Sequence, residues 1–125
     1  MKRILFIEDE SALQRAASKV LTQEGYEILS ALDGETGLAL ARKEKPDLVL
    51  LDLILPRKNG FEVLQEIKSD PEIKSIPIII LSNLEGSADV EKALQLSATT
   101  YLTKTNYNLE EVVQKIKELL DNPTK

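Results

Sequence analysis

Acidic residues follow two of the most apolar segments of this sequence. Glu8 and Asp9 come directly after the run at residues 4–7, and Asp52 comes directly after the run at residues 48–51. If both runs are strands of one parallel sheet, their carboxyl ends meet at one edge and the carboxylates converge on one crevice. Oxygen ligands without histidine or cysteine suit a hard divalent cation, and Mg²⁺ is the ion we expect. The simpler alternative is that Glu8 is a solvated loop acid and Asp52 caps a turn, but acids after both strands favour the ion site.

A hydroxyl and an ammonium group follow two further apolar segments. Ser82 follows the run at residues 78–81, and Lys104 lies just after the segment at residues 99–102. Each of these residues alone is more often an ordinary turn or surface residue. Beside the acids, they predict a site for a metal and a phosphoryl group, in which Mg²⁺ and Lys104 neutralise the charge on the transferred group. Asp52 would then be the nucleophile and form an aspartyl phosphate.

The elements that must position these residues alternate along the chain. Three continuous apolar runs, at residues 4–7, 48–51 and 78–81, are typical of strands buried on both faces of a parallel sheet. The segments 26–30 and 99–102 mix polar and apolar residues, which favours strands at the sheet edges. With a helical pattern after each strand, the sequence predicts a doubly wound α/β domain with a five-stranded parallel sheet in the order 2-1-3-4-5 and helices on both faces.

Capping signals predict where several of the helices begin. Three candidate capping boxes place a Ser or Asn three residues before a Gln or Glu: Ser11 and Gln14, Asn59 and Glu62, Asn108 and Glu111. Asp33-Gly34 turns the chain into another helix, and Gly25 is expected to stop the first one. A weaker helical pattern follows Gly86.

Composition limits what the chain can do. Its 125 residues suit a single domain over residues 1–125 and leave no room for an output domain in this chain. A net charge of −5 argues against direct nucleic-acid binding, which depends on Lys and Arg neutralising phosphates. The absence of Cys and His excludes disulfides, Ser-His-Asp or Cys-His catalysis and His metal ligation. We expect a cytoplasmic protein without membrane insertion, because the only apolar run near the N-terminus is four residues long.

Taken together, these motifs resemble the receiver domain of two-component response regulators. The resemblance covers essentially the whole chain, and its elements follow the order of the predicted strands: Glu8-Asp9, the stretch at residues 52–60, Ser82, and Tyr101-Leu102-Thr103-Lys104. Each element alone is weak, and the ordered set is specific. The resemblance implies a flavodoxin-like receiver fold and a role in phosphorelay signal transduction.

The resemblance also implies how the phosphorylation site works. Asp52 would accept a phosphoryl group from a sensor histidine kinase or a histidine phosphotransfer protein. Asp9 and Asp52 would ligate Mg²⁺ directly, the backbone carbonyl of Ile54 would be a third protein ligand, and Glu8 would act through water. The domain would be a signalling module and no enzyme in the usual sense, beyond self-catalysed phosphorylation and dephosphorylation of Asp52.

Further residues would report the phosphorylated state. Ser82 would hydrogen-bond a phosphoryl oxygen, Lys104 would pair with the same group, and Tyr101 looks like the family's switch aromatic. An edge-strand tyrosine whose hydroxyl reaches water is an equal alternative for Tyr101. The resemblance places the switching surface on helix 4, strand 5 and helix 5, about residues 87–120, leaves a phosphorylation-dependent dimer open and does not identify the downstream target.

Two positions depart from the family's usual pattern. Asn83 stands where a small residue usually follows the switch hydroxyl, and its side chain could partly cover the site and slow phosphoryl transfer or hydrolysis. Thr105 stands where Lys104 is usually followed by a proline in a cis bond. Because a cis bond before a non-proline residue costs about 2.5–4 kcal/mol, we predict a trans Lys104-Thr105 bond.

Three rival functions share parts of this pattern. A flavodoxin-like flavin carrier needs a phosphate-binding loop after the first strand, where this chain has acids that would repel phosphate. A phosphatase with an aspartyl nucleophile would ordinarily need an acid two residues after Asp52, where Ile54 cannot serve. A receiver-like interaction module acting without phosphorylation keeps the fold and loses the chemistry, and the joint presence of the acids, Ser82 and Lys104 argues against it.

Overall fold

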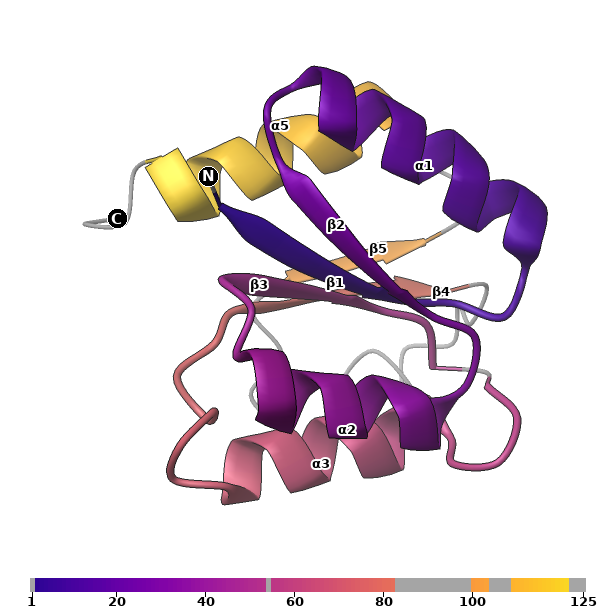
Figure 1. Cartoon of the computed structure of the whole chain (residues 1–125), viewed down its shortest axis with the longest axis vertical. Coiled ribbons are helices and arrows are strands. Elements are labelled where there is room, and N and C mark those ends of the chain that lie inside the picture. Colours follow the sequence, from indigo (N-terminus) through magenta and orange to yellow (C-terminus); the bar gives the residue numbers. More distant parts are fainter. Residues whose placement is uncertain (1, 54, 83–99, 104–108, 122–125) are drawn as a thin grey trace.

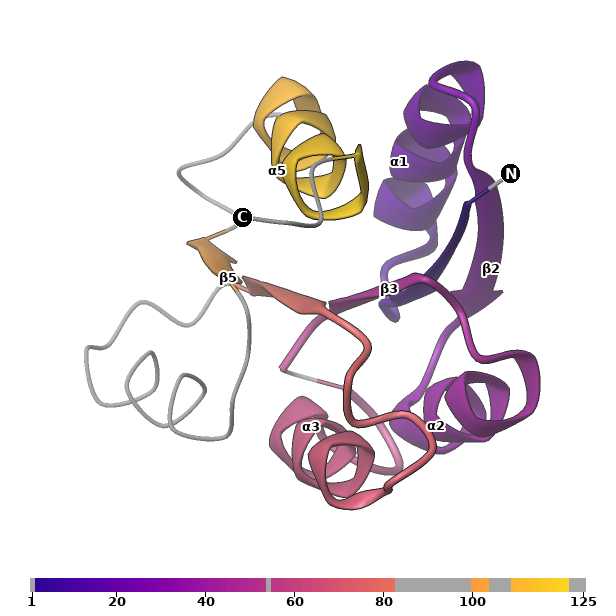
Figure 2. The same cartoon turned by 90° about the vertical axis from the view of Figure 1, so that its left-hand side faces the viewer.

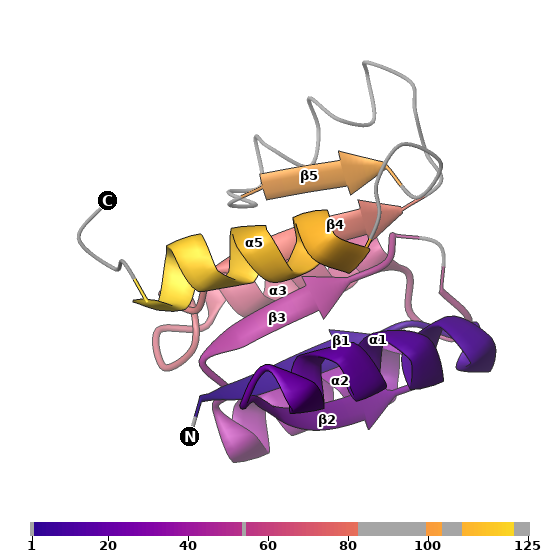
Figure 3. The same ribbon diagram turned by 90° about the horizontal axis from the view of Figure 1, so that it is seen from above.

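Five parallel strands form one sheet in the order β2-β1-β3-β4-β5. This computed structural model describes residues 2–53, 55–82, 100–103 and 109–121. The strands run side by side with their arrowheads at the same end of the sheet (Figure 3), and their bounds are β1 Arg3–Ile7, β2 Glu27–Ala31, β3 Leu48–Leu51, β4 Ile78–Ser82 and β5 Thr100–Thr103. The predicted parallel sheet and its strand order are confirmed.

Within the described ranges, helices cover both faces of the sheet (Figures 1 and 2). The helices are α1 Ser11–Gln23, α2 Gly34–Glu44, α3 Gly60–Ser69 and α5 Leu109–Asp121. Helices α1 and α5 lie together on one face, and α2 and α3 lie together on the other (Figure 2). The weaker helical pattern predicted after Gly86 lies outside the described residues.

Each face of the sheet carries its own apolar core. Along β1, Leu5 and Ile7 point to the core under α2 and α3, whereas Ile4 and Phe6 point to the core under α1 and α5. All four side chains are fully buried. Because successive strand residues face opposite sides, a strand buried on both faces must be apolar at every position. Full burial of each such side chain contributes about 1.5–3 kcal/mol, so the continuous runs set the centre of the sheet.

The predicted helix starts are partly confirmed. Asn59 forms a reciprocal capping box, in which its Oδ1 accepts the Glu62 N–H at 3.0 Å and the Asn59 N–H is donated to the Glu62 Oε1 at 3.2 Å. Asp33 caps α2, and its Oδ1 accepts the Thr36 N–H at 2.8 Å. Gly25, with a φ of 96°, follows the C-cap of α1 as predicted. Asn108 lies outside the described residues.

The capping box predicted at Ser11 is wrong. Ser11 is the first residue of α1, and Glu10 occupies the N-cap position without a side-chain capping bond. Gln14 does not reach back to the helix start. Its side chain is buried and donates hydrogen bonds to backbone carbonyls of the sheet. The pattern Ser-x-x-Gln therefore predicted the helix start correctly. It predicted the wrong hydrogen-bond partner for the Gln14 side chain.

Candidate functional site

Strand pairing brings the acids of β1 and β3 to one edge of the sheet. The last residues of the two strands, Ile7 and Leu51, are register partners, so the residues that follow them leave the sheet side by side. The Asp52 N–H donates to the Ile7 carbonyl at 3.0 Å, and the Glu8 N–H donates to the Ala31 carbonyl at 3.0 Å. The backbone ladder thus extends one residue past each strand and fixes where the Glu8 and Asp52 side chains begin.

The three predicted acids form one compact cluster. Each of Glu8, Asp9 and Asp52 offers a carboxylate oxygen, and these oxygens all lie within 4.8 Å of one another. Glu8 is fully buried, Asp52 is 3% exposed, and Asp9 is exposed. The Glu8 Oε2 accepts a hydrogen bond from the Glu10 N–H at 3.0 Å, which holds its carboxylate in the β1–α1 loop.

The cluster fits a hard divalent cation by its chemistry. Three carboxylates this close repel one another, and two of them are almost fully removed from water, where an unbalanced charge is costly. All the donors are carboxylate oxygens, and Asp9 is exposed to solvent. Bound Mg²⁺ or Mn²⁺ would balance this charge and accept the oxygens as ligands.

Helix α3 holds Asp52 from the other side. The N–H of Gly60, the first residue of α3, donates to the Leu53 carbonyl at 2.9 Å. A Cβ atom at Gly60 would overlap the Asp52 carbonyl oxygen and the Leu53 Cα, so only glycine allows the helix to approach this closely. Asp52 is therefore fixed between the β3 ladder and the first turn of α3.

The loop between β3 and α3 is docked onto the start of α2. Arg57 adopts a left-handed φ of 71°, and its Nη2 and Nε donate to the Glu35 Oε1 at 2.7 and 2.9 Å. A Cβ atom at Gly34 would overlap the Lys58 carbonyl, so glycine permits this contact as well. The pKa of Asp33 lies below its usual range, because its carboxylate accepts the N–H and the hydroxyl of Thr36 and faces Arg57.

The other predicted site residues are only partly described. Ser82 ends β4 and is the register partner of Thr103, and Tyr101 lies in β5 opposite Ile80, but the described part of the chain does not include their side chains. Four further residues lie outside the described ranges: Ile54, Asn83, Lys104 and Thr105. The roles of these residues and the trans Lys104-Thr105 bond stay predictions.

Gln14 contacts the backbone of the acid cluster, and the sequence interpretation missed this contact. Gln14 is 5% exposed, and with Ala17 and Leu21 it forms the buried stripe of α1. The spacing of three and four residues between these positions is the period of a helix face, so the sequence did carry a signal that position 14 points inward. A polar residue on that stripe predicts a buried hydrogen-bonding task.

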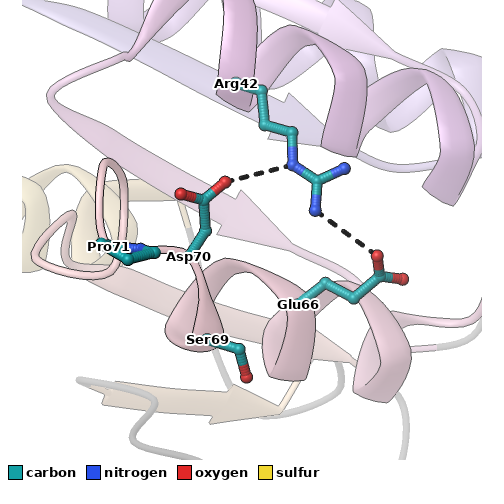
Figure 4. A pocket seen from close by; sticks show the side chains of 5 residues that line it. All are labelled: Arg42, Glu66, Ser69, Asp70 and Pro71. Atoms are coloured by element: carbon teal, nitrogen blue, oxygen red, sulfur yellow. Dashed lines mark hydrogen bonds and ion pairs between the residues drawn. The ribbon is translucent and has the colours of Figure 1, made fainter.

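A separate cavity of about 410 Å³ lies near the far ends of α2 and α3. Figure 4 shows Arg42 of α2 between Asp70 and Glu66, with ion-pair distances of 3.3 Å to the Asp70 Oδ2 and 3.5 Å to the Glu66 Oε1. Ser69 and Pro71 complete the lining. The cavity lies at the opposite end of α3 from Gly60, so it takes no part in the acid cluster.

Comparison with known proteins identifies the family. The family model described as "Response regulator receiver domain" matches residues 4–117. This chain belongs to the response regulator receiver family. The receiver is a signalling module of two-component phosphorelay systems, as the sequence predicted, and the alternative of a module acting without phosphorylation is not favoured.

Named relatives agree with this assignment. The receiver is 36% identical over 104 residues to Protein PilH of Pseudomonas aeruginosa, covering 83% of this chain and 86% of PilH. It is 39% identical over 102 residues to Response regulator PleD of Caulobacter vibrioides, covering 82% of this chain. The receiver spans only 22% of the length of PleD.

A solved structure confirms the fold. The Mn²⁺-bound form of response regulator Rcp1 superimposes with a TM-score of 0.83 at 36% sequence identity, covering 94% of this chain and 93% of Rcp1. Among the described residues, no helix combines the length and apolar character needed to cross a membrane.

Proposed function

We propose that Asp52 of this receiver accepts a phosphoryl group in a step that depends on Mg²⁺. The observation that carries the proposal is the cluster of Glu8, Asp9 and Asp52, whose oxygens lie within 4.8 Å of one another at the carboxyl edge of the sheet. The donor would be a phosphohistidine of a sensor histidine kinase or of a histidine phosphotransfer protein. These 125 residues contain no histidine, so the phosphohistidine must lie outside them.

The proposed transfer uses a carboxylate oxygen of Asp52 as the nucleophile. This oxygen attacks the phosphorus, a new O–P bond forms, and the P–N bond of the donor breaks with its electron pair remaining on the imidazole nitrogen. Asp52 is positioned for this step because its backbone is held by the Ile7 carbonyl on one side and by the first turn of α3 on the other. In self-catalysed dephosphorylation, water would attack the same phosphorus, the O–P bond to Asp52 would break, and inorganic phosphate would leave while the carboxylate is restored.

Asp9 and Asp52 would hold the cation directly, with Glu8 acting through water and the Ile54 carbonyl as a further ligand. The relative Rcp1 was crystallised in a Mn²⁺-bound form, which supports a divalent cation in this family. When bound, the cation would neutralise charge on the phosphoryl oxygens. Asp9 is exposed, so an incoming ion would meet its carboxylate before those of the two buried acids.

The remaining roles complete the proposed switch. Ser82 would hydrogen-bond a phosphoryl oxygen, Lys104 would pair with its charge, and Tyr101 would change rotamer with Ser82. Phosphorylation adds roughly −1.5 to −2 charges at the acid cluster, and this local change would alter the surface formed by about residues 87–120. We place the whole process in the cytoplasm, where kinases and receivers meet.

Mass spectrometry after incubation with acetyl phosphate and Mg²⁺ tests the proposal. The wild-type receiver should gain the mass of one phosphoryl group on Asp52, and Asp52→Asn should gain none. Asp70→Asn is the matched control, because Asp70 lies at the far end of α3, and it should be modified like the wild type. Excess chelator should abolish the modification. An unmodified wild type, or an Asp52→Asn variant modified to the same extent, would refute the assignment of Asp52.

A further inference from the structure

Among the residues whose burial the structure describes, Gln14 is the buried polar side chain outside the acid cluster. Its side-chain Nε2 donates hydrogen bonds to the carbonyls of Phe6 at 2.8 Å, Ala31 at 3.0 Å and Glu8 at 3.2 Å. One amide thus connects the end of β1, the end of β2 and the loop that follows β1. The backbone N–H of Gln14 also donates to the Glu10 carbonyl at 3.0 Å, which fixes the first turn of α1 to the same loop.

The carbonyl of Glu8 gives this contact its importance. It belongs to the peptide unit between Glu8 and Asp9, the two acids that β1 contributes to the cluster. The Ala31 carbonyl, which accepts from Gln14, also accepts the Glu8 N–H at 3.0 Å. Gln14 therefore holds the backbone on both sides of Glu8, and the orientation of that backbone decides where the Glu8 and Asp9 carboxylates point.

We propose that Gln14 is a positioning residue for the cation site, acting through the Glu8–Asp9 peptide. The inference rests on the proposed binding of a divalent cation by Glu8, Asp9 and Asp52. Groups that hold metal ligands in place without touching the metal commonly change affinity by about 10–100-fold when removed. Gln14 would be such a group, and it lies on helix α1, which contributes no ligand to the proposed site.

Packing alone does not account for a glutamine at this position. Its neighbours on the buried stripe of α1 are Ala17 and Leu21, and an apolar side chain would fill the same space without removing a polar group from water. The polar contacts of its amide all run from Nε2 to the three carbonyls; within the described residues, no hydrogen-bond partner lies near the Gln14 Oε1. The side chain is thus used as a donor toward the backbone around the acids.

These contacts make Gln14→Met the most informative variant. Methionine has nearly the same length and volume as glutamine and is unbranched, so it should fill the site while removing every donated hydrogen bond. The matched control is Ile67→Val, a fully buried position in the opposite core layer under α3, which should perturb packing without touching the β1–α1 loop.

Cation binding by the unphosphorylated protein is the first readout. Mg²⁺ titration by calorimetry, and Mn²⁺ titration by electron paramagnetic resonance, should give a Kd for Gln14→Met about tenfold higher than for the wild type. Ile67→Val should keep the wild-type Kd. If Gln14→Met keeps the wild-type Kd while the wild type binds the cation, the positioning role is refuted and the proposed function stands. If the wild type binds no divalent cation, the proposed function itself fails.

The dependence of phosphorylation on cation concentration is the second readout. With acetyl phosphate as donor, Gln14→Met should need more Mg²⁺ to reach half of its maximal rate, and its rate at saturating Mg²⁺ should stay close to that of the wild type. An equal fall in rate at all Mg²⁺ concentrations would indicate general damage and refute the positioning role. If Gln14→Met does not fold, Gln14→Asn is the second variant. Its amide is one methylene shorter and should not reach the three carbonyls, so its Kd should also rise. A wild-type Kd for Gln14→Asn would refute the positioning role.

Discussion

Gly60→Ala is the substitution that most directly links packing to the chemistry of Asp52. The added methyl group would meet the Asp52 carbonyl oxygen and the Leu53 Cα, both well inside the 3.0 Å that real Cβ atoms keep from other atoms. These neighbours are backbone atoms, so no rotamer change can relieve the overlap. Opening it to an ordinary contact requires α3 and Asp52 to separate by roughly 1 Å, and a misplacement of this size can cost about 100-fold in rate.

We therefore expect Gly60→Ala to lower both stability and reactivity. Overpacking of this kind costs about 1–3 kcal/mol in the free energy of unfolding, measured by urea denaturation. The rate of Asp52 phosphorylation by acetyl phosphate at saturating Mg²⁺, followed by mass spectrometry, should fall about 100-fold.

Gly37→Ala is the matched control for this variant. A Cβ atom at Gly37 would meet side-chain atoms of Ile7 at 2.5–2.8 Å, a similar crowding against atoms that can move without the backbone. Gly37→Ala should therefore lose stability and keep its phosphorylation rate. If Gly60→Ala phosphorylates at the wild-type rate, or if Gly37→Ala loses as much rate, the claim that the glycine contact positions Asp52 is refuted.

Three further predictions concern stability. Because the folded-state pKa of Asp33 lies below its unfolded value, the ionised carboxylate stabilises the fold above the usual carboxylate range, and this stability is lost as the pH falls through the folded pKa. Asp33→Asn keeps a cap without the charge, so its melting temperature should fall less on acidification than that of the wild type. An unchanged dependence of the melting temperature on pH would contradict this. Asn59→Ala should cost about 1 kcal/mol in urea denaturation by removing the capping box of α3, and a neutral result would show that the box contributes nothing. Leu50→Ala should cost about 2–5 kcal/mol in the same assay, because Leu50 is fully buried in the core under α1 and α5, and a cost below that of Asn59→Ala would contradict the assignment of β3 as a central strand.

The central sheet could be predicted from sequence because its physical signal is local. A strand buried on both faces has no polar positions, so the run at residues 48–51 marked β3 with its observed bounds. The acid cluster could also be predicted from sequence, because the acids directly follow two such runs and the strand order brings those runs together. The start of α3 at Asn59 was predicted correctly, because the whole capping box lies within four consecutive residues.

Contacts between distant elements could not be predicted in this way. The Arg57–Glu35 ion pair joins residues 22 positions apart, and nothing in either segment specifies its partner. Gln14 was misassigned for a different reason. Two local patterns, a capping box and an amphipathic stripe, competed for the same residue, and burial in the fold decided in favour of the stripe.

The division of the apolar core into two layers has a consequence for how this receiver can vary. The cluster under α2 and α3 and the cluster under α1 and α5 share no residue, because the strands send alternate side chains to opposite faces. A substitution in one layer, such as Leu64→Ala, reaches the other layer only through the strand backbones. Each core layer can therefore change in sequence independently of the other. The acids follow strands that pack against both layers, so the packing of both layers constrains their positions.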